Sequence, residues 1–259
     1  MTFSREILLA FAALSLAAGG CHRPTTLRDA AQALEKDDYD QTIVLANKAL
    51  TEEPKGPKAA EALYIRGRAA EARVAKNNIQ LAANMQAARA SYVLALQQRP
   101  SPLLITYLRA SLGKVAFFQD DFQTAIQQLS MAYAELKDRE LKAASLFYLG
   151  KSQQRSGQFQ QADQTFATIA KSFADLGWAQ KAEAVRGATA FYLQLAVYEK
   201  PESIEAAAKL VQQRGLKTAR FKDDQGRYLL RAGPYASYAQ AKQLRPKVAD
   251  AFPDATIMP

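Results

Sequence analysis

The feature that most constrains the fold of this 259-residue chain is a pattern that occurs twice, 37 residues apart. Both copies place a Leu-Gly pair ahead of an aromatic and a small residue at helical spacing. The matched positions are Leu112, Gly113, Phe122 and Ala125 in the first copy, and Leu149, Gly150, Phe159 and Ala162 in the second. A repeat of roughly 20–50 residues rich in good helix formers indicates stacked helical units.

The expected unit is a pair of helices that cross closely. Gly113 and Gly150 would allow the second helix of each pair to approach the first, and Ala125 and Ala162 would lie at the crossing. Turn residues between the helices include two acidic pairs, which favour helix caps over a pair of catalytic carboxylates. They are Asp37-Asp38 and Asp120-Asp121.

Two weaker copies precede these. Residues 37–54 match the second half of a unit, and residues 67–100 match a unit with an insertion of about nine residues near 75–84. A last helix over residues 175–186, with Trp178, would end the array. The pattern resembles the tetratricopeptide repeat (TPR), a helix-turn-helix unit of about 34 residues. This resemblance implies a concave surface that binds a protein partner. A generic helical bundle with accidental periodicity is the alternative.

The N-terminus predicts export. Arg5 precedes an apolar run over residues 7–18, and Gly19-Gly20 separate that run from Cys21. A positive start, a short apolar stretch and small residues before a cleavage site are typical of a secretory signal, here residues 1–20. The run is shorter than the roughly 20 residues that a membrane-spanning helix needs.

Cys21 is the only cysteine, so the chain cannot form an intramolecular disulfide. The segment Ala18-Gly19-Gly20-Cys21 resembles a bacterial lipobox, although Ala18 stands where Leu is usual. The resemblance implies an acyl anchor on Cys21, with residues 21–26 as the lipidated N-terminus and linker, and attachment of the protein to a membrane. His22 in place of Asp favours the outer membrane, facing the periplasm. Plain secretion with a free thiol is the alternative.

After residue 187 the pattern changes from helical to alternating. We predict strands over residues 191–198, 216–221, 227–232 and 254–258, and helices over 204–214 and 237–252. Gly233-Pro234 is expected to end the third strand. The order βαββαβ indicates a four-stranded antiparallel sheet with two helices on one face. The fold class is therefore mainly α: a helical array over 27–187, then a small α+β, ferredoxin-like domain over 188–259.

Two segments of this tail resemble the sporulation-related (SPOR) repeat. They are Tyr-Leu-Leu-Arg-Ala-Gly-Pro-Tyr at residues 228–235 and Leu-Gln-Leu-Ala-Val-Tyr at residues 193–198. The resemblance implies binding of bacterial peptidoglycan, especially glycan strands stripped of their peptides, on the open face of the sheet. The chain departs from the family where Ala196-Val197 replace Gly-Ser.

Strand alternation assigns side chains to the two faces of the sheet. On the first strand, Tyr192, Gln194, Ala196 and Tyr198 are expected to face outward. On the third strand, the outward residues would include Arg227, Leu229, Arg231 and Gly233. Aromatic rings can stack on sugars, and amide and guanidinium groups can bind polar substituents. The resemblance selects Gln194, Tyr198 and Arg231 as glycan-binding residues, with Tyr192 and Arg227 beside them. A face that is merely solvated or covered by a partner is the alternative.

The sequence contains few other motifs that would indicate catalysis, nucleotide binding or metal binding. The only histidine is His22, and we find no nucleotide-binding loop and no Cys or His spacing for a metal, so we expect no catalytic residues, no metal and no cofactor. The net charge of +9 favours anionic partners. RNA binding would fit a basic four-stranded sheet, but the signal sequence argues against nucleic acid. We therefore predict a non-enzymatic envelope lipoprotein that links an envelope protein to sites of wall remodelling or cell division. A scaffold whose tail binds protein is the rival.

Overall fold

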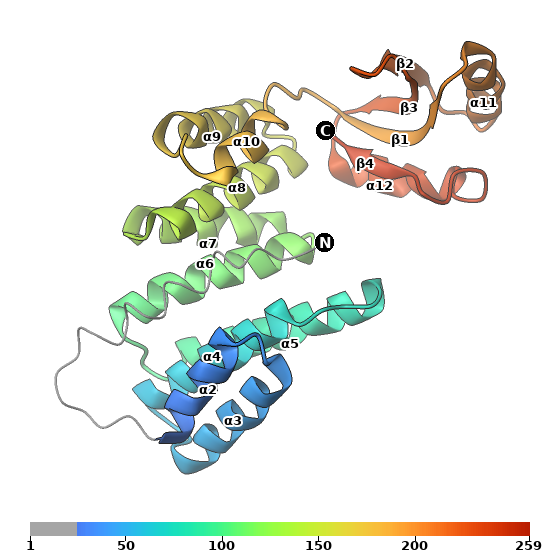
Figure 1. Ribbon diagram of the computed structural model, residues 1–259. Coiled ribbons are helices and arrows are strands. Elements are labelled where there is room, and N and C mark those ends of the chain that lie inside the picture. Colours follow the sequence, from blue (N-terminus) through green and yellow to red (C-terminus); the bar gives the residue numbers. More distant parts are fainter. Residues whose placement is uncertain (1–24) are drawn as a thin grey trace. The chain divides into compact units, whose positions relative to one another are not determined.

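The computed structural model describes residues 25–259 (Figure 1). The predicted signal peptide, the acylation site Cys21 and His22 lie outside the described residues. Helices form the first part of the described chain, and a small antiparallel sheet with helices forms the last part, so the predicted fold class is confirmed. The domain bounds 27–187 and 188–259 remain predictions.

Helices that follow one another in sequence pack against each other in the array, α2 on α3, α4 on α5 and α6 on α7. Pro57 and Pro102 occupy the first positions of α4 and α6, where the missing N–H costs no hydrogen bond. The bounds are α2 Thr25–Glu35, α3 Tyr39–Glu52, α4 Pro57–Ala72, α5 Asn78–Leu96, α6 Pro102–Phe118, α7 Phe122–Glu135, α8 Arg139–Arg155, α9 Phe159–Ser172 and α10 Gly177–Glu183.

The second residue of each acidic pair between helices is a helix cap, as predicted. The Asp38 side chain accepts a hydrogen bond from the Gln41 backbone N–H at 3.1 Å, at the start of α3. Asp121 does the same for Thr124 at 3.3 Å at the start of α7. Each of these caps satisfies a backbone donor that has no partner within its helix.

Three glycines lie directly beneath large side chains of the next helix. A Cβ added to Gly113 would lie 2.5 Å from Leu129 Cγ, and one added to Gly150 would lie 2.6 Å from Phe166 Cε1. Both partners are sixteen positions further along the chain. A Cβ added to Gly67 would lie 2.4 Å from Cε1 of Tyr92, and Tyr92 is twenty-five positions further along the chain. The separation of Gly67 from Tyr92 is nine positions longer than the other two separations, which confirms the predicted insertion. The predicted close helix crossings are also confirmed. The assignment of the array to the TPR family remains a prediction.

The described residues divide into two compact units. The first comprises residues 25–149 and 172–178, and the second comprises residues 150–171 and 179–259. The predicted last helix is present as α10 but ends at Glu183, before the predicted end at 186. Its Trp178 belongs to the first unit, where the ring is buried and Nε1 donates a hydrogen bond to Glu140 Oε1 at 2.6 Å.

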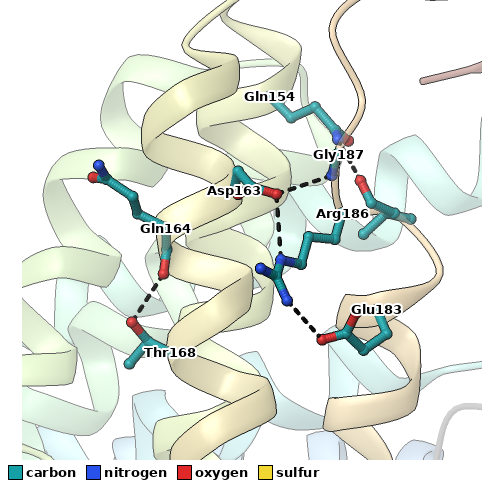
Figure 2. Close-up of polar contacts among 8 residues, drawn as sticks. Gln154, Asp163, Gln164, Thr168, Glu183, Arg186 and Gly187 are labelled. Atoms are coloured by element: carbon teal, nitrogen blue, oxygen red, sulfur yellow. Dashed lines mark hydrogen bonds and ion pairs between the residues drawn. The ribbon is translucent and has the colours of Figure 1, made fainter.

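The chain between α10 and the sheet is fixed by polar contacts within the second unit (Figure 2). Asp163 Oδ1 accepts a hydrogen bond from the Gly187 backbone N–H at 2.9 Å and forms an ion pair with Arg186 at 3.4 Å. Arg186 Nη1 also donates to Glu183 at 3.0 Å, and Gln154 Nε2 donates to the Val185 carbonyl at 2.9 Å. These bonds satisfy backbone groups of a segment without regular secondary structure.

The sheet has the order β2-β3-β1-β4, and all its pairs are antiparallel. The elements are β1 Phe191–Tyr198, α11 Pro201–Gln213, β2 Thr218–Lys222, β3 Tyr228–Tyr235, α12 Tyr238–Leu244, the 3₁₀ turn η2 Arg245–Lys247 and β4 Thr256–Met258. Residues of both helices join the core on one face of the sheet, among them Ile204, Ala208, Val211 and Ala241. The predicted βαββαβ order is therefore confirmed.

Several predicted boundaries in this domain are wrong, among them the ends of β3 and α12. Strand β3 does not end at Gly233-Pro234 but continues to Tyr235, which pairs with Phe191. Pro234 is tolerated because the pairing of β3 with β2 extends only to Ala232, so no neighbour needs its missing N–H. The predicted helix over 237–252 ends at Leu244, and Pro246 then lies in a 3₁₀ turn, since proline disrupts the interior of an α-helix.

Candidate functional site: the open face of the sheet

One face of the sheet packs on α11 and α12, and the other carries a mixture of aromatic, apolar and polar side chains. The strand register identifies this open face, because residues directly opposite each other point to the same side. Gln194 of β1 lies opposite Arg231 of β3, which lies opposite Ala219 of β2. We define the open face by these and the residues that share their side, namely Tyr192, Gln194, Val197, Ala219, Phe221, Leu229, Arg231, Thr256 and Met258.

A bulge in β1 changes which side chains reach the open face. The pairing of β1 with β3 shifts between Gln194 and Ala196, so alternation reverses beyond this point. Tyr198 packs against the core instead of facing outward, and its burial raises the pKa of its phenol. Val197 takes the outward place and is 41% exposed. The predicted outward orientation of Ala196 and Tyr198 is therefore wrong, and Tyr198 is not part of the open face.

Tyr192, Phe221 and Arg231 form one cluster on the open face. The rings of Tyr192 and Phe221 meet edge to face, with centroids 5.6 Å apart. The Arg231 guanidinium carbon lies 4.6 Å from the Phe221 centroid and 5.9 Å from that of Tyr192. A cation this close to ring faces is attracted by their quadrupoles. The cluster therefore combines apolar ring surface with a fixed positive charge.

Gly233 makes room for this cluster. A Cβ at this position would lie 2.9 Å from Tyr192 Cδ1 and 3.0 Å from the Phe191 carbonyl oxygen. Its φ of +135° is also one that residues with a side chain rarely adopt. Glycine is thus required both by the backbone conformation and by the ring above it.

Gln194 lies at the centre of the open face, between Arg231 on β3 and Thr256 on β4. It is half-buried, so its amide remains within reach of a ligand. An amide both donates and accepts hydrogen bonds, which suits hydroxyl and acetamido groups. The structure therefore keeps Tyr192, Gln194 and Arg231 together, as the sequence predicted.

Arg227 lies outside this group. It precedes β3 in the hairpin turn, where its Nε donates to Asp223 Oδ2 at 2.7 Å. Partial burial alone would raise the pKa of Asp223, but the hydrogen bonds from Arg227 hold it below its usual value. The guanidinium thus stabilises the turn between β2 and β3, and its role in glycan binding remains a prediction.

Phe221 was not among the residues predicted for the site. The sequence indicated a strand ending at this residue but did not assign its face. Its position opposite Leu229 places it on the open side. The signal that could have found it is the register of the hairpin around residues 223–226, because Leu229 was already expected to point outward.

A comparison with known families agrees with this geometry. Residues 187–259 match the SPOR domain. SPOR domains are binding domains that generally recognise peptidoglycan and occur in cell-envelope and cell-division proteins. The match begins at Gly187 and covers the whole sheet with both helices. No curated protein and no solved structure matches the chain.

A second candidate site lies in the first unit, among α4, α6 and α8. A small hollow there is lined by tyrosines and charged residues, including Tyr64, Arg68, Glu71, Tyr107, Lys114 and Tyr148. Lys114 Nζ lies 2.7 Å from Glu71 Oε1, and both side chains are almost completely buried. Arg68 Nη1 donates to the Tyr64 hydroxyl at 3.2 Å. The hollow therefore combines aromatic walls with a net positive charge.

Within residues 25–259, no helix is long and apolar enough to cross a membrane. In the same residues, no group of three or more His, Cys, Asp or Glu side chains could hold a metal ion.

Proposed function

We propose that the open face of the SPOR domain binds the glycan strands of peptidoglycan, preferably strands stripped of their stem peptides. The observation that carries this proposal is the cluster of Tyr192, Phe221 and Arg231 beside Gln194. Pyranose rings have apolar C–H faces that pack on aromatic rings, and polar substituents that need hydrogen-bonding partners. A long, regular polymer is matched better by an open sheet face than by an enclosed pocket.

The departure at Ala196-Val197 affects this face at one position. Ala196 is on the core side, opposite Leu230, whereas Val197 is exposed and lies opposite Leu229. The hydroxyl of the family's Ser is thus replaced on the open face by an apolar side chain. We propose that this end of the face contacts sugar through apolar surface, while Gln194 and Arg231 supply the polar contacts.

Replacing Gln194 or Tyr192 by Ala is expected to weaken binding to peptidoglycan sacculi. A neutral hydrogen bond contributes about 0.5–1.5 kcal/mol, so losing the Gln194 contact should raise the dissociation constant up to roughly tenfold. Sedimentation of the purified protein with amidase-treated sacculi measures this change. Circular dichroism of each variant checks that the fold is retained.

Lys209→Ala is the matched control for these variants. Lys209 is exposed on α11, which lies on the other side of the sheet. Its replacement should leave sedimentation unchanged. If the unaltered protein stays in the supernatant with sacculi of every kind, the glycan proposal is wrong, and a scaffold whose tail binds protein becomes the better interpretation.

We also propose that the protein is anchored to a membrane, the outer membrane where the source has one, by acyl chains on Cys21. The support is the sequence of residues 5–21, with a short apolar run that ends at Gly19-Gly20. Labelling with a fatty-acid analogue should mark the unaltered protein and not Cys21→Ala. Equal labelling of the two would contradict the anchor, and a secreted protein with a free thiol would then be the better interpretation.

The helical array is proposed to bind an envelope protein partner. The paired helices with glycine crossings fit the TPR resemblance, which implies a concave surface that binds a protein segment. With an anchor at one end and wall binding at the other, the protein would connect this partner to sites of wall remodelling at cell division. The SPOR match is the observation that favours this role.

A further inference from the structure

Arg231 is in an unusual position for an arginine. It occupies the middle of the sheet, half-buried on β3, where its neighbours in register are Gln194 and Ala219. None of the open-face residues defined above is acidic, so no carboxylate of this face neutralises the guanidinium. Among the described residues, its Nε is also buried without a hydrogen-bond partner. Buried polar groups are normally paired, so such a group calls for an explanation.

The two aromatic rings hold the guanidinium without using its donors. Phe221 and Tyr192 attract its charge through their ring faces at 4.6 and 5.9 Å. A guanidinium has five N–H donors in a rigid fork, and two parallel donors match the two oxygens of a carboxylate. The arrangement thus fixes a cation whose natural partner is an anion supplied by the ligand.

Peptidoglycan presents such an anion on the sugar itself only after its stem peptide has been removed. In an intact strand, the lactyl group of muramic acid is joined to the first amino acid by an amide bond. An amidase adds water across that bond: the C–N bond breaks, a C–O bond forms, and the glycan retains a carboxylate while the peptide leaves with an ammonium group. Peptide carboxylates of intact strands lie further from the sugar ring than this lactyl group.

We propose that Arg231 determines the specificity of the open face by pairing with the free lactyl carboxylate of peptide-stripped muramic acid. The inference rests on the proposed function, because it assumes that sugar rings lie on the open face. It goes beyond that function by assigning the preference for stripped strands to a single ion pair, between Arg231 and the lactyl carboxylate. Steric exclusion of the peptide would give the same preference without any role for this charge.

The test compares three kinds of sacculi in a sedimentation assay with the full-length protein. They are intact sacculi, amidase-stripped sacculi, and stripped sacculi whose carboxylates have been coupled to methylamine with a carbodiimide. We expect the unaltered protein to prefer stripped over methylamide sacculi by roughly ten- to a hundredfold, the effect of a hydrogen bond to a charged group. Steric exclusion predicts equal binding to these two, since neither carries a peptide. Equal binding would overturn the proposal even if every variant failed to fold.

Variants of Arg231 test whether this residue causes the preference for the free carboxylate. Arg231→Gln should lower binding to stripped sacculi by the same roughly ten- to a hundredfold and leave binding to methylamide sacculi nearly unchanged. Arg231→Lys should recover only part of the loss, since lysine keeps the charge but not the planar fork. Arg245→Gln removes one exposed guanidinium from the 3₁₀ turn after α12 and should change neither measurement.

The two proposals fail in different ways. If Arg231→Gln binds sacculi and still prefers stripped over methylamide strands, the role of Arg231 is wrong and glycan binding stands. If the unaltered protein sediments with none of the three preparations, glycan binding itself is wrong.

Discussion

Replacing Glu71 with Gln is expected to lower the free energy of unfolding by about 3–5 kcal/mol, because the change leaves Lys114 buried without its counter-ion. Lys114 Nζ and the Tyr92 hydroxyl each lie 2.7 Å from a different oxygen of the Glu71 carboxylate. These residues lie on three different helices, α4, α5 and α6, so the pair joins two neighbouring helix pairs. Equilibrium denaturant unfolding measures the loss.

The pKa values of this pair indicate its effect on stability. Burial alone would raise the pKa of Glu71, but the charges of Lys114 and Arg68 outweigh burial and hold it below the ordinary value of 4.5. Burial alone would lower the pKa of Lys114, but Glu71 raises it above the ordinary 10.5. The contribution of Glu71 is therefore full above pH 4.5 and lost as the pH falls through its folded pKa. That of Lys114 is full below pH 10.5 and lost as the pH rises further.

The controls separate a buried pair from an exposed one. Asp40 forms an ion pair with Arg73 at 2.9 Å but is 74% exposed, so Asp40→Asn should cost no more than about 1 kcal/mol. Combining Glu71→Leu with Lys114→Met should recover part of the loss, because the buried ammonium is then removed together with its counter-ion, while the nearby Arg68 keeps its charge. A loss below about 1 kcal/mol for Glu71→Gln at neutral pH would contradict the predicted role of the pair.

Replacing Gly113 with Ala is expected to destabilise the array by about 1–3 kcal/mol, although Ala normally stabilises a helix relative to Gly. The added Cβ would lie 2.5 Å from Leu129 Cγ and 3.1 Å from the Leu129 backbone nitrogen. Leu129 is buried, so α6 and α7 must move apart to admit the methyl group. Gly113→Leu should cost more. Thermal melts and denaturant unfolding measure the change.

Gly177→Ala is the matched control for this prediction. Gly177 begins α10, and a Cβ there would have nothing within 4 Å. The substitution should be neutral or should stabilise the protein by roughly 0.4–1 kcal/mol. A double variant of Gly113→Ala with Leu129→Ala should lose less stability than the sum of the single variants, since the second change makes room for the first. Additive losses would argue against the direct contact.

The sequence predicted the array well because its signals are local. The close approaches at Gly113 and Gly150 follow from a small residue at a helix crossing, and the caps at Asp38 and Asp121 follow from turn chemistry within a few residues. The order of strands and helices in the SPOR domain was also predictable, because alternation and turn residues mark each element. The end of the helix at Leu244 was missed, although Pro246 is a local signal for it.

The site was only partly predictable, and β1 shows why. Alternation placed Tyr192 and Gln194 correctly, but the bulge before Ala196 reversed the faces of Val197 and Tyr198. A bulge depends on how two strands are paired, and the neighbouring strand is distant in sequence. The pairing of Arg227 with Asp223 in the turn is a further contact that strand alternation does not predict.

What the sequence by itself determined is therefore the kind and order of the elements, since helical periodicity, caps, turns and strand alternation act over a few residues. Only the tertiary structure decided which side chains meet. Strand register brought Phe221 and Tyr192 to Arg231 on the open face, and helix packing brought Lys114 to Glu71. Contacts between residues far apart in sequence are fixed by register and packing, and no local pattern encodes either of them.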